Sequence, residues 1–401
     1  MKQNWEIKKL GKVCDFQNGF AFKSKTYKED GQPILRITNI QNQSLEINDL
    51  VYFHENDYKE NFERFKVYKD DLVIAMSGAT TGKLGINKSD IVFYLNQRVG
   101  KFIPKENLSK PYLYYFLSTK VEESLRIAAG AAQPNLSTEQ INNFEIPLPT
   151  LQEQQRIVAI LDEAFSAIDK AKTNTEQNLK NAKELFESEL ERVFSEKGDD
   201  WEETSVKKET EILVGFAFKS KEYTENKDDI LLLRGDNIMQ GYFRWEDVKR
   251  WDKSEYQDYK KYQLQENDII LAMDRPWVKA GLKIASLSKN DLPALLVQRT
   301  ACLRTKSNLD NSFLFHLLKS NRFMKYLIDV QTGIGVPHIS GQQISDFRFY
   351  KPTIKDQQKI VSKLDALREQ TKKLEAVYEK KLQDLEELKK SVLSKAFSGE
   401  L

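Results

Sequence analysis

The sequence predicts an α+β fold that is used twice, with two long helices pairing between the copies. Three observations predict this. GFAFKSKTY at 19–27 returns as GFAFKSKEY at 215–223. The segments around it recur in the same order, at an offset that grows only from 196 to 203. After Pro149, and again after Pro352, a long polar stretch follows without Pro or Gly. We therefore expect a pseudo-twofold molecule.

The repeat extends well beyond the opening motif. It continues in three pairs of segments: ILRITNI (34–40) with LLLRGDNI (231–238), DLVIAM (71–76) with DIILAM (268–273), and LPTLQEQQRIVAILD (148–162) with KPTIKDQQKIVSKLD (351–365). A unit of roughly 200 residues is far longer than the period of a solenoid repeat. Each copy should therefore fold as a unit of its own.

Composition bounds the class of protein. The 401 residues are 40% hydrophobic, which suits a globular chain with substantial cores. No apolar run is long enough to span a membrane, and the first ten residues lack the apolar core of a signal peptide, so we expect a cytoplasmic protein without a membrane partner. Cys14 and Cys302 do not occupy matching places in the two copies, which fits a reducing compartment. The net charge of +2 is too small to indicate a class of binding partner.

The globular part of each copy reads as short β-rich segments divided by turn signals. ILRIT, DLVIAM and DIVFYL are the strand-like segments of the first copy. One helix is predicted in each copy, at 111–130 and 312–333, because apolar residues recur there every three or four positions and a glycine follows. The sequence therefore indicates a compact α+β domain.

The stretches 152–197 and 354–397 predict two long helices. Apolar or small residues recur at alternating intervals of three and four, which is the pattern of a heptad seam. In the first helix they are Ile157, Leu161, Ala164, Ile168, Ala171, Leu179, Ala182, Phe186, Leu190 and Val193. In the second they are Ile360, Leu364, Leu367, Leu374, Tyr378, Leu382, Leu385, Leu388 and Val392. At 1.5 Å per residue each helix would be roughly 65 to 70 Å long.

Charge favours pairing of these two helices with each other. Residues 152–197 carry 7 Lys+Arg and 10 Asp+Glu, a net of −3, whereas 354–397 carry 11 and 8, a net of +3. Opposite net charges favour the mixed pair over either self-pair. An antiparallel pair would place one globular domain at each end of a rod. The alternative is that each long helix lies across its own domain.

Signs of catalysis are weak. The chain has no Asp/Asn-Pro-Pro-Tyr/Phe motif and no glycine-rich loop after a strand, which argues against a methyltransferase site. GATTGKL (78–84) has the wrong spacing for a phosphate-binding loop and lacks the hydroxyl that follows its lysine. His54, His316 and His338 lie near neither cysteine, so no zinc site is indicated. His316 falls within a predicted helix and reads as structural, while His338, on a loop, could contact a ligand.

Polar residues shared by both copies are candidates for contacts that do not depend on the base sequence of a nucleic acid. They are Lys23, Ser24, Lys25, Arg36 and Asn39 in the first copy, and Lys219, Ser220, Lys221, Arg234 and Asn237 in the second. Exposed lysines are often merely solvated, so FKSK supports either role. For Arg98 and Arg299, which sit in repeated Gln-Arg pairs, a structural or interdomain role is favoured over contact with DNA.

Loops that differ between the copies are candidates for reading different sequences. The loop after DLVIAM is Ser77–Lys83 in one copy, and the loop after DIILAM is Asp274–Lys279 in the other. A second pair of loops is GAAQPNLS and GIGVPHIS. The candidates in these loops are Thr80, Thr81, Lys83, Gln133 and Asn135, and in the second copy Arg275, Trp277, Lys279 and His338.

Over its whole length the chain resembles the specificity subunit of a type I restriction-modification system. The resemblance rests on GFAFKS, LR…NI, the DLVIAM turn and the IPLPTLQEQQRIV helix entry, each present twice, and on the ending LSKAFSGEL. It implies two target-recognition domains, at 1–150 and 198–352, each reading one half of a bipartite DNA site. It also implies two antiparallel coiled-coil helices, at 151–197 and 353–401, which set the gap between the half-sites.

The resemblance also implies partners. The subunit would bind double-stranded DNA and assemble with two modification (methyltransferase) subunits and with restriction (endonuclease and translocase) subunits. S-adenosylmethionine, ATP and Mg²⁺ would act in those partners, and this chain would bind no cofactor or metal and catalyse nothing. The second helix entry, IKDQQ in place of LQEQQ, departs from the pattern and would make the two docking sites for modification subunits unequal.

Two other functions are open from the residues alone. One is a coiled-coil scaffold whose twin domains bind protein or carbohydrate. The other is an enzyme with a degenerate site. A steep dependence of binding on salt concentration would distinguish DNA binding from the scaffold, because phosphate contacts release counterions.

Overall fold

The computed structural model describes residues 5–41, 44–129, 135–196, 198, 200–278, 281–333 and 335–401. The chain divides into two compact units, and each is described by itself. Unit 1 comprises Met1–Glu176 and Lys380–Leu401, and unit 2 comprises Gln177–Glu379. The long helices α5 (Leu151–Ser195) and α10 (Ile354–Ser398) each contribute one half to each unit. The two long helices predicted from the sequence are thus confirmed.

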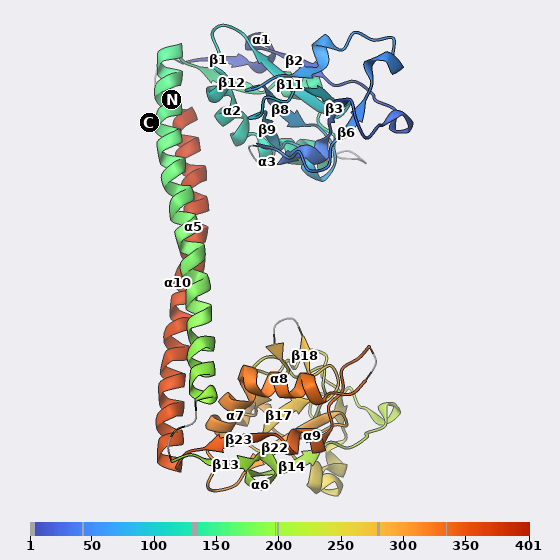
Figure 1. The fold of residues 1–401 in the computed structure, drawn as a ribbon, viewed down its shortest axis with the longest axis vertical. Helices are drawn as coiled ribbons and strands as arrows, with labels where there is room; N and C mark the ends of the chain where they lie inside the picture. The colour runs from blue at the N-terminus through green and yellow to red at the C-terminus, as the bar shows by residue number, and fades with distance from the viewer. Residues whose placement is uncertain are drawn as a thin grey trace. The chain divides into compact units, whose positions relative to one another are not determined.

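The globular part of unit 1 contains short strands and short helices (Figure 1). Its helices are α1 (Leu10–Val13), α2 (Lys110–Thr119), α3 (Val121–Ala129) and α4 (Thr138–Asn142). Its strands are β1 (Glu6–Lys9), β2 (Cys14–Asn18), β3 (Gln32–Leu35), β4 (Ile40–Gln41), β5 (Ser44–Leu45), β6 (Val51–Phe53), β7 (Lys66–Val67), β8 (Leu72–Ala75), β9 (Leu84–Ile86), β10 (Phe93–Leu95), β11 (Val99–Pro104) and β12 (Glu145–Leu148).

The globular part of unit 2 repeats this plan. Its helices are α6 (Val206–Glu209), α7 (Asn311–Lys319), α8 (Asn321–Val330) and α9 (Gly341–Ser345). Its strands are β13 (Glu202–Ser205), β14 (Thr210–Val214), β15 (Ile230–Leu233), β16 (Arg250–Trp251), β17 (Ile269–Ala272), β18 (Trp277–Val278), β19 (Gly281–Leu282), β20 (Ile284–Ser286), β21 (Ala294–Leu296), β22 (Thr300–Thr305) and β23 (Arg348–Lys351).

The two units share the order of their central strands, although the second sheet has four strands in unit 1 and three in unit 2. In unit 1 an antiparallel sheet has the order β2-β11-β8-β9, and a second sheet, β6-β3-β10-β7, contains one parallel pair, β3 with β10. In unit 2 the corresponding orders are β14-β22-β17-β20 and β16-β15-β21, with β15 parallel to β21. The mixed sheets and short helices confirm the α+β prediction.

The central strands β8 and β17 are apolar throughout because both of their faces are buried. Along β8, Leu72 and Ile74 point into a core shared with α2 and α5, whereas Val73 and Ala75 point into the core beneath the second sheet. Unit 2 repeats this alternation, with Ile269 and Leu271 in one core and Ile270 and Ala272 in the other. Each globular part therefore has three layers: helices, a sheet and a second sheet.

The prediction of a single helix in each globular part is wrong, because two helices occupy each of these stretches. The break lies at Lys120 in unit 1 and at Ser320 in unit 2. Ser320 has an extended backbone (ψ 155°), and its hydroxyl donates to the carbonyl of Leu317 at 2.7 Å. Serine competes for backbone hydrogen bonds in this way, which favours the end of one helix and the start of the next.

The repeated Gln-Gln of the helix entry fastens each long helix to its own globular part. Gln154 is fully buried; its amide nitrogen donates to the carbonyls of Asn107 and Pro149, and its oxygen accepts from the Ser109 N–H at 2.9 Å. Gln357 makes the same three hydrogen bonds in unit 2, to Asn308, Pro352 and Asp310. We call this set of three hydrogen bonds the glutamine clamp.

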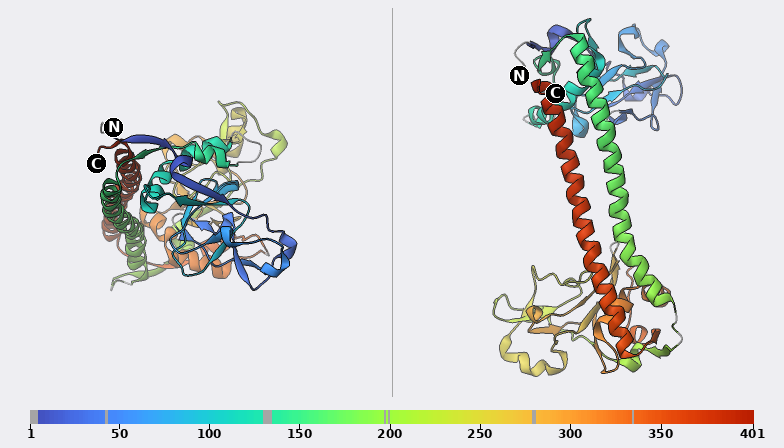
Figure 2. Two further views of the ribbon diagram at one scale, coloured as in Figure 1. Left: turned by 90° about the horizontal axis from the view of Figure 1, so that it is seen from above. Right: turned by 90° about the vertical axis from the view of Figure 1, so that its left-hand side faces the viewer.

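The long helices lie side by side in antiparallel sense in each unit (Figures 1 and 2). Ion pairs join α5 to α10 in both units: Lys172–Glu386 at 2.6 Å and Asp169–Lys389 at 3.2 Å in unit 1, and Glu189–Lys363 at 2.8 Å and Lys183–Glu379 at 3.8 Å in unit 2. In two of these four pairs α5 supplies the base and α10 the acid. The net charges of opposite sign therefore describe only part of the pairing.

Two of the predicted seam residues of α10 are not in the seam. Leu374 and Leu388 are 41% and 47% exposed, while Thr371 is fully buried and Glu375 is half-buried. The heptad phase runs through Leu364, Thr371, Tyr378, Leu385 and Val392. The prediction erred because it required an apolar residue at every seam position, whereas α10 places a threonine and a glutamate there.

A second contact between helix and domain differs in chemistry between the units. Tyr115 of α2 donates its hydroxyl to Asp162 of α5 in unit 1. At the matching place in unit 2, His316 of α7 contacts Asp365 of α10, with 2.8 Å between Nε2 and Oδ1. His316 is 7% exposed, so the sequence-based assignment of a structural role is confirmed. Burial lowers the pKa of His316, although Asp365 opposes that shift.

We expect replacement of His316 by tyrosine to make unit 2 less sensitive to acid. The folded-state pKa of His316 lies below its ordinary value near 6.5, so the unfolded chain binds more protons as the pH falls through that value. Wild-type stability should therefore fall between pH 7 and pH 5, and the H316Y variant should lose less over this range. Urea unfolding at several pH values measures this. Parallel pH profiles for the two proteins would contradict it.

Candidate functional site

Unit 2 contains a polar hollow of about 590 Å³ at the loops that follow its central strands. Four basic side chains line it: Arg234 after β15, Arg275 after β17, Lys283 before β20 and Arg299 before β22. Asp236 and Asp274 are its two carboxylates. Tyr223, the last residue of the repeated GFAFKSKxY motif, also lines it.

Part of this charge is balanced within the hollow. Arg234 donates to Asp236 at 2.7 Å, and Arg299 donates to Asp274 Oδ2 at 2.5 Å. His338 Nδ1 lies 2.5 Å from the other oxygen of Asp274. Burial alone would raise the pKa of Asp274, but the hydrogen bonds with His338 and Arg299 outweigh it, and the pKa is lowered. Asp274 is therefore a carboxylate that holds two neighbouring side chains in place.

The other two basic residues have no acidic partner among the described residues. Within that part of the chain, no carboxylate oxygen lies within 4 Å of the Arg275 guanidinium or the Lys283 ammonium. Burial lowers the pKa of Lys283, with Asp236 opposing and Arg244 and Arg275 adding to the shift. A half-buried ammonium without a partner is favourable only where an anion or water approaches. The hollow is thus suited to a ligand with negative charge.

Backbone geometry supports a positioned site. Arg275 has a φ of 45° and Arg299 a φ of 65°, both in the left-handed region that glycine prefers. A non-glycine residue held there costs on the order of 1 kcal/mol or more. The surrounding hydrogen bonds hold both: the Arg275 N–H donates to the Pro337 carbonyl, and the Arg299 carbonyl accepts from Met273.

Unit 1 places matching residues at the same points of its fold. The Ala75 N–H donates to the Lys83 carbonyl at 2.9 Å, and the Ala272 N–H donates to the Lys283 carbonyl at 3.1 Å, so Lys83 and Lys283 correspond. The sequence comparison matched Lys83 with Lys279 and missed Lys283. The cause is the β18–β19 hairpin, an insertion that shifts the register; the signal was Lys-Leu-Gly against Lys-Ile-Ala immediately after it.

The arginines of the two Gln-Arg pairs are both exposed, and each contacts another side chain of its own unit. The Arg299 side chain is 69% exposed at the hollow, and Arg98 is exposed and donates to Asn135 Oδ1 at 3.2 Å. Both side chains thus contact a residue of their own unit while staying exposed, so the preference for a structural role over DNA contact stays a prediction. Arg36 is half-buried, and its guanidinium donates to the Asp49 carbonyl at 2.7 Å.

Three predicted contact residues are occupied inside the fold. Asn39 and Asn237 are 2% and 6% exposed; each oxygen accepts from the backbone N–H three residues earlier, and each nitrogen donates to a backbone carbonyl. Thr81 is 1% exposed and donates to the Gly78 carbonyl at 2.7 Å. These side chains close turns, as short polar side chains often do, and are not available to a partner. They leave the candidate set.

The remaining candidates are exposed to different degrees. The FKSK loops are exposed in both units, at Lys23, Ser24, Lys25, Lys219, Ser220 and Lys221. They stand on clusters of aromatic rings such as Phe22 with Phe62 and Phe218 with Trp251. Thr80 is half-buried, and Trp277 packs on the core of unit 2 outside the hollow. Gln133 and Lys279 lie outside the described residues.

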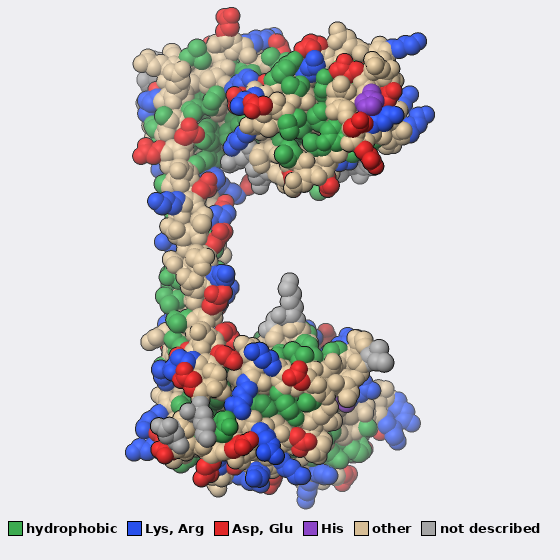
Figure 3. All heavy atoms as spheres, viewed as in Figure 1, with side chains coloured by type: hydrophobic (Ala, Val, Ile, Leu, Met, Phe, Trp, Pro, Cys, Tyr) green, Lys and Arg blue, Asp and Glu red, His purple; other side chains and the backbone are tan. Residues whose placement is uncertain are grey.

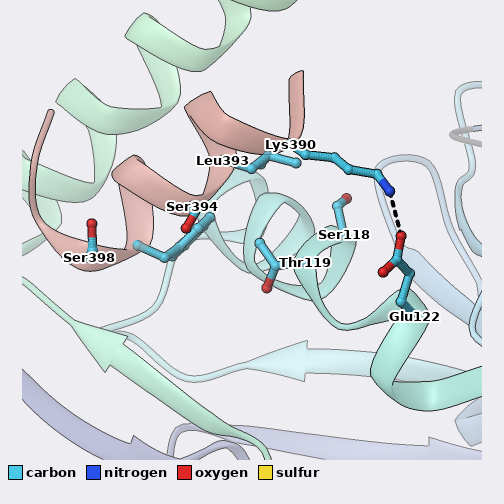
Figure 4. Close-up of a pocket in the computed structure, with 8 residues that line it drawn as sticks. Ser118, Thr119, Glu122, Lys390, Leu393, Ser394 and Ser398 are labelled. Atoms are coloured by element: carbon cyan, nitrogen blue, oxygen red, sulfur yellow. Dashed lines mark hydrogen bonds and ion pairs between the residues drawn. The ribbon is translucent and has the colours of Figure 1, made fainter. Parts of the chain in front are cut away.

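A second hollow, of about 610 Å³, lies in unit 1 where the end of α10 meets α2 and α3 (Figure 4). Serine and threonine hydroxyls line it, together with an ion pair between Glu122 and Lys390 at 2.7 Å. Because its charges are balanced, it lacks the excess of positive charge found in unit 2. We regard this hollow as part of the packing contact between the end of α10 and helices α2 and α3 of the same unit.

Among the described residues, no three His, Cys, Asp or Glu side chains cluster so that they could hold a metal ion. Within the same part of the chain, no helix combines the length and the apolar composition needed to cross a membrane.

The chain is similar in sequence to a known protein family. The model of the type I restriction modification DNA specificity domain matches residues 2–181 and 198–386. The MjaVIII specificity subunit of Methanocaldococcus jannaschii is 28% identical over 84% of this chain and 80% of its own length. The EcoKI specificity subunit of Escherichia coli is 24% identical over the whole chain and 90% of its own length.

Solved structures share the fold. An HsdS subunit from Thermoanaerobacter tengcongensis matches with a TM-score of 0.67, covering all of this chain and 98% of its own. A chain from a structure of the type I R-M system, determined to explain its complex assembly and conformational transition, matches with a TM-score of 0.76 over 99% of its length. Both are 16% identical in sequence, so they bear on the fold alone.

Proposed function

The chain belongs to the type I restriction-modification DNA specificity family, and from that premise we propose that each of its two units reads one half of a split DNA target. It is the DNA-specificity subunit of such a complex and is not itself an enzyme. Family membership implies no cofactor of its own. S-adenosylmethionine, ATP and Mg²⁺ belong, in this proposal, to the partner subunits.

The observation that carries the proposal is the basic hollow of unit 2. Duplex DNA presents closely spaced phosphates, and arginine and lysine side chains neutralise them with release of counterions. Arg275 and Lys283 have no carboxylate partner among the described residues, so a phosphate would relieve the unfavourable burial of Lys283. The exposed FKSK lysines would extend the basic surface of each unit.

The long helices serve, in this proposal, as spacer and docking surface. The domain boundaries predicted from the sequence, 1–150, 151–197, 198–352 and 353–401, assign the recognition role to the globular parts. Leu374 and Val377 of α10 are 41% and 59% exposed. Acidic and basic side chains are interspersed along the long helices (Figure 3). Apolar side chains exposed on a charged helix suit a protein partner.

The assembly would act in the cytoplasm on double-stranded DNA, with two modification subunits docked on the helices and restriction subunits attached to them. The second helix entry differs from the first at IKDQQ, although its clamp glutamine makes the same hydrogen bonds. The inequality of the two docking sites stays a prediction.

We expect the double variant R275A/K283A to bind DNA more weakly than the wild type. Each lost phosphate contact should reduce the slope of log K against log salt by about 1, and affinity should fall for all sequences. The measurement is binding of duplex DNA by the chain in complex with its modification subunits, between 50 and 200 mM salt. K227A, which removes an exposed lysine outside the hollow, is the matched control.

Two results would count against this function. Binding of the wild type that does not depend on salt would point to a protein or carbohydrate ligand, as in the scaffold alternative. A salt slope that is the same in the double variant and the wild type would remove the hollow from the DNA-binding surface.

A further inference from the structure

Three positions in each unit are brought together by the backbone. In unit 1 the Met76 N–H donates to the Arg98 carbonyl and the Met76 carbonyl accepts from Leu136, so the side chains of Ser77, Arg98 and Asn135 meet at the end of β8. Unit 2 has the same hydrogen bonds, from Met273 to Arg299 and from Ile339 to Met273. There the corresponding side chains are Asp274, Arg299 and His338. We call each set of three a reading triad.

The arginine is common to both triads, but its neighbours are not. In unit 2 the two carboxylate oxygens of Asp274 are shared between Arg299 and His338, each at 2.5 Å. In unit 1 a neutral amide takes this part, since Arg98 donates to Asn135 at 3.2 Å, and Ser77 brings no charge. The guanidinium of Arg299 is therefore held firmly by a carboxylate, whereas that of Arg98 is held more weakly by a neutral amide.

Arg299 has the chemistry of a base reader. The carboxylate engages one end of its guanidinium, while the side chain is 69% exposed, which leaves other N–H groups free to donate. A planar guanidinium held in place can donate two hydrogen bonds to O6 and N7 of guanine in the major groove. A carboxylate that fixes it beforehand reduces the entropy lost on binding.

We propose that the reading triads determine specificity, and that Arg299, positioned by Asp274, donates to a guanine in the half-site read by unit 2. This rests on the function proposed above and goes beyond it in naming the group that reads and the base that it reads. Because the neighbours of Arg98 differ, unit 1 reads a different half-site with the same scaffold.

The test is the sequence of methylated sites in a host that carries the chain and its modification subunits. For R299A we expect one guanine of one half-site to become degenerate, with discrimination there falling about 10- to 100-fold and the other half-site unchanged. R299K, which keeps the charge but cannot make a bidentate contact, should relax the same position. D274N should relax it less, and R98A should alter only the other half-site.

The outcomes separate the inference from the function beneath it. Methylation that weakens at every sequence in R299A, with the motif unchanged, makes Arg299 a phosphate contact and overturns the triad. An unchanged motif at unchanged efficiency also overturns it. If the wild type methylates no split motif, the proposed function itself fails. Co-purification of each variant with the modification subunits shows that it is folded.

Discussion

Replacement of Gln357 by leucine should lower the free energy of unfolding of unit 2 by about 3 kcal/mol. Leucine fills a similar volume but leaves the buried carbonyl of Pro352, and the partly buried Asp310 N–H and Asn308 carbonyl, without their partner. Unpaired buried polar groups cost about 1 to 3 kcal/mol each, less what relaxation or entering water recovers. The loss falls where the helix joins the domain.

The adjacent residue supplies the matched control. Gln358 is exposed, so Q358L should change stability by no more than about 0.5 kcal/mol. Urea unfolding followed by tryptophan fluorescence reports mainly on unit 2, because Trp201, Trp245, Trp251 and Trp277 lie there. Equal midpoints for Q357L and Q358L would show that the clamp contributes little. Q154L with Q155L repeats the comparison in unit 1.

The features that could be predicted from the sequence are those carried by local patterns. The central strands were recognised because burial on both faces leaves an unbroken apolar run, as at DLVIAM. The long helices were recognised because a heptad pattern persists over many turns. Most of the seam of α5 follows the predicted positions, including Ile157, Leu161 and Phe186.

What could not be predicted depends on contacts distant in sequence. Thr371 takes a seam position that Leu374 was expected to fill, since pairing in the antiparallel helix sets the phase. Lys283 was missed because a hairpin insertion shifts the register. The exposure of the arginine in the second Gln-Arg pair depends on the backbone at Arg299, which has a φ of 65° that the sequence does not reveal. The buried amides of Asn39 and Asn237 look, in sequence, like those of DNA-reading asparagines.

Removal of one heptad from both long helices should abolish binding to the original target. We would delete Glu176–Ala182 and Tyr378–Asp384, which lie where Lys183 pairs with Glu379 and Lys172 with Glu386, so that the seam keeps its phase. Seven residues shorten a helix by about 10.5 Å, the rise of about 3 bp of DNA. Seven residues are nearly two full helical turns, so the side chains beyond the deletion keep almost the same direction around the helix axis.

The DNA cannot follow that change simply. Half-sites brought about 3 bp closer are also rotated by roughly 100° about the duplex, because a turn takes 10 to 10.5 bp. We therefore expect methylation of the original motif to disappear, with any residual activity on a motif whose gap is shorter by about 3 bp. Methylation mapping measures both, and deletion of the heptad from α5 alone is the control that breaks the pairing. An unchanged gap in the double deletion would show that the helices do not set the spacer.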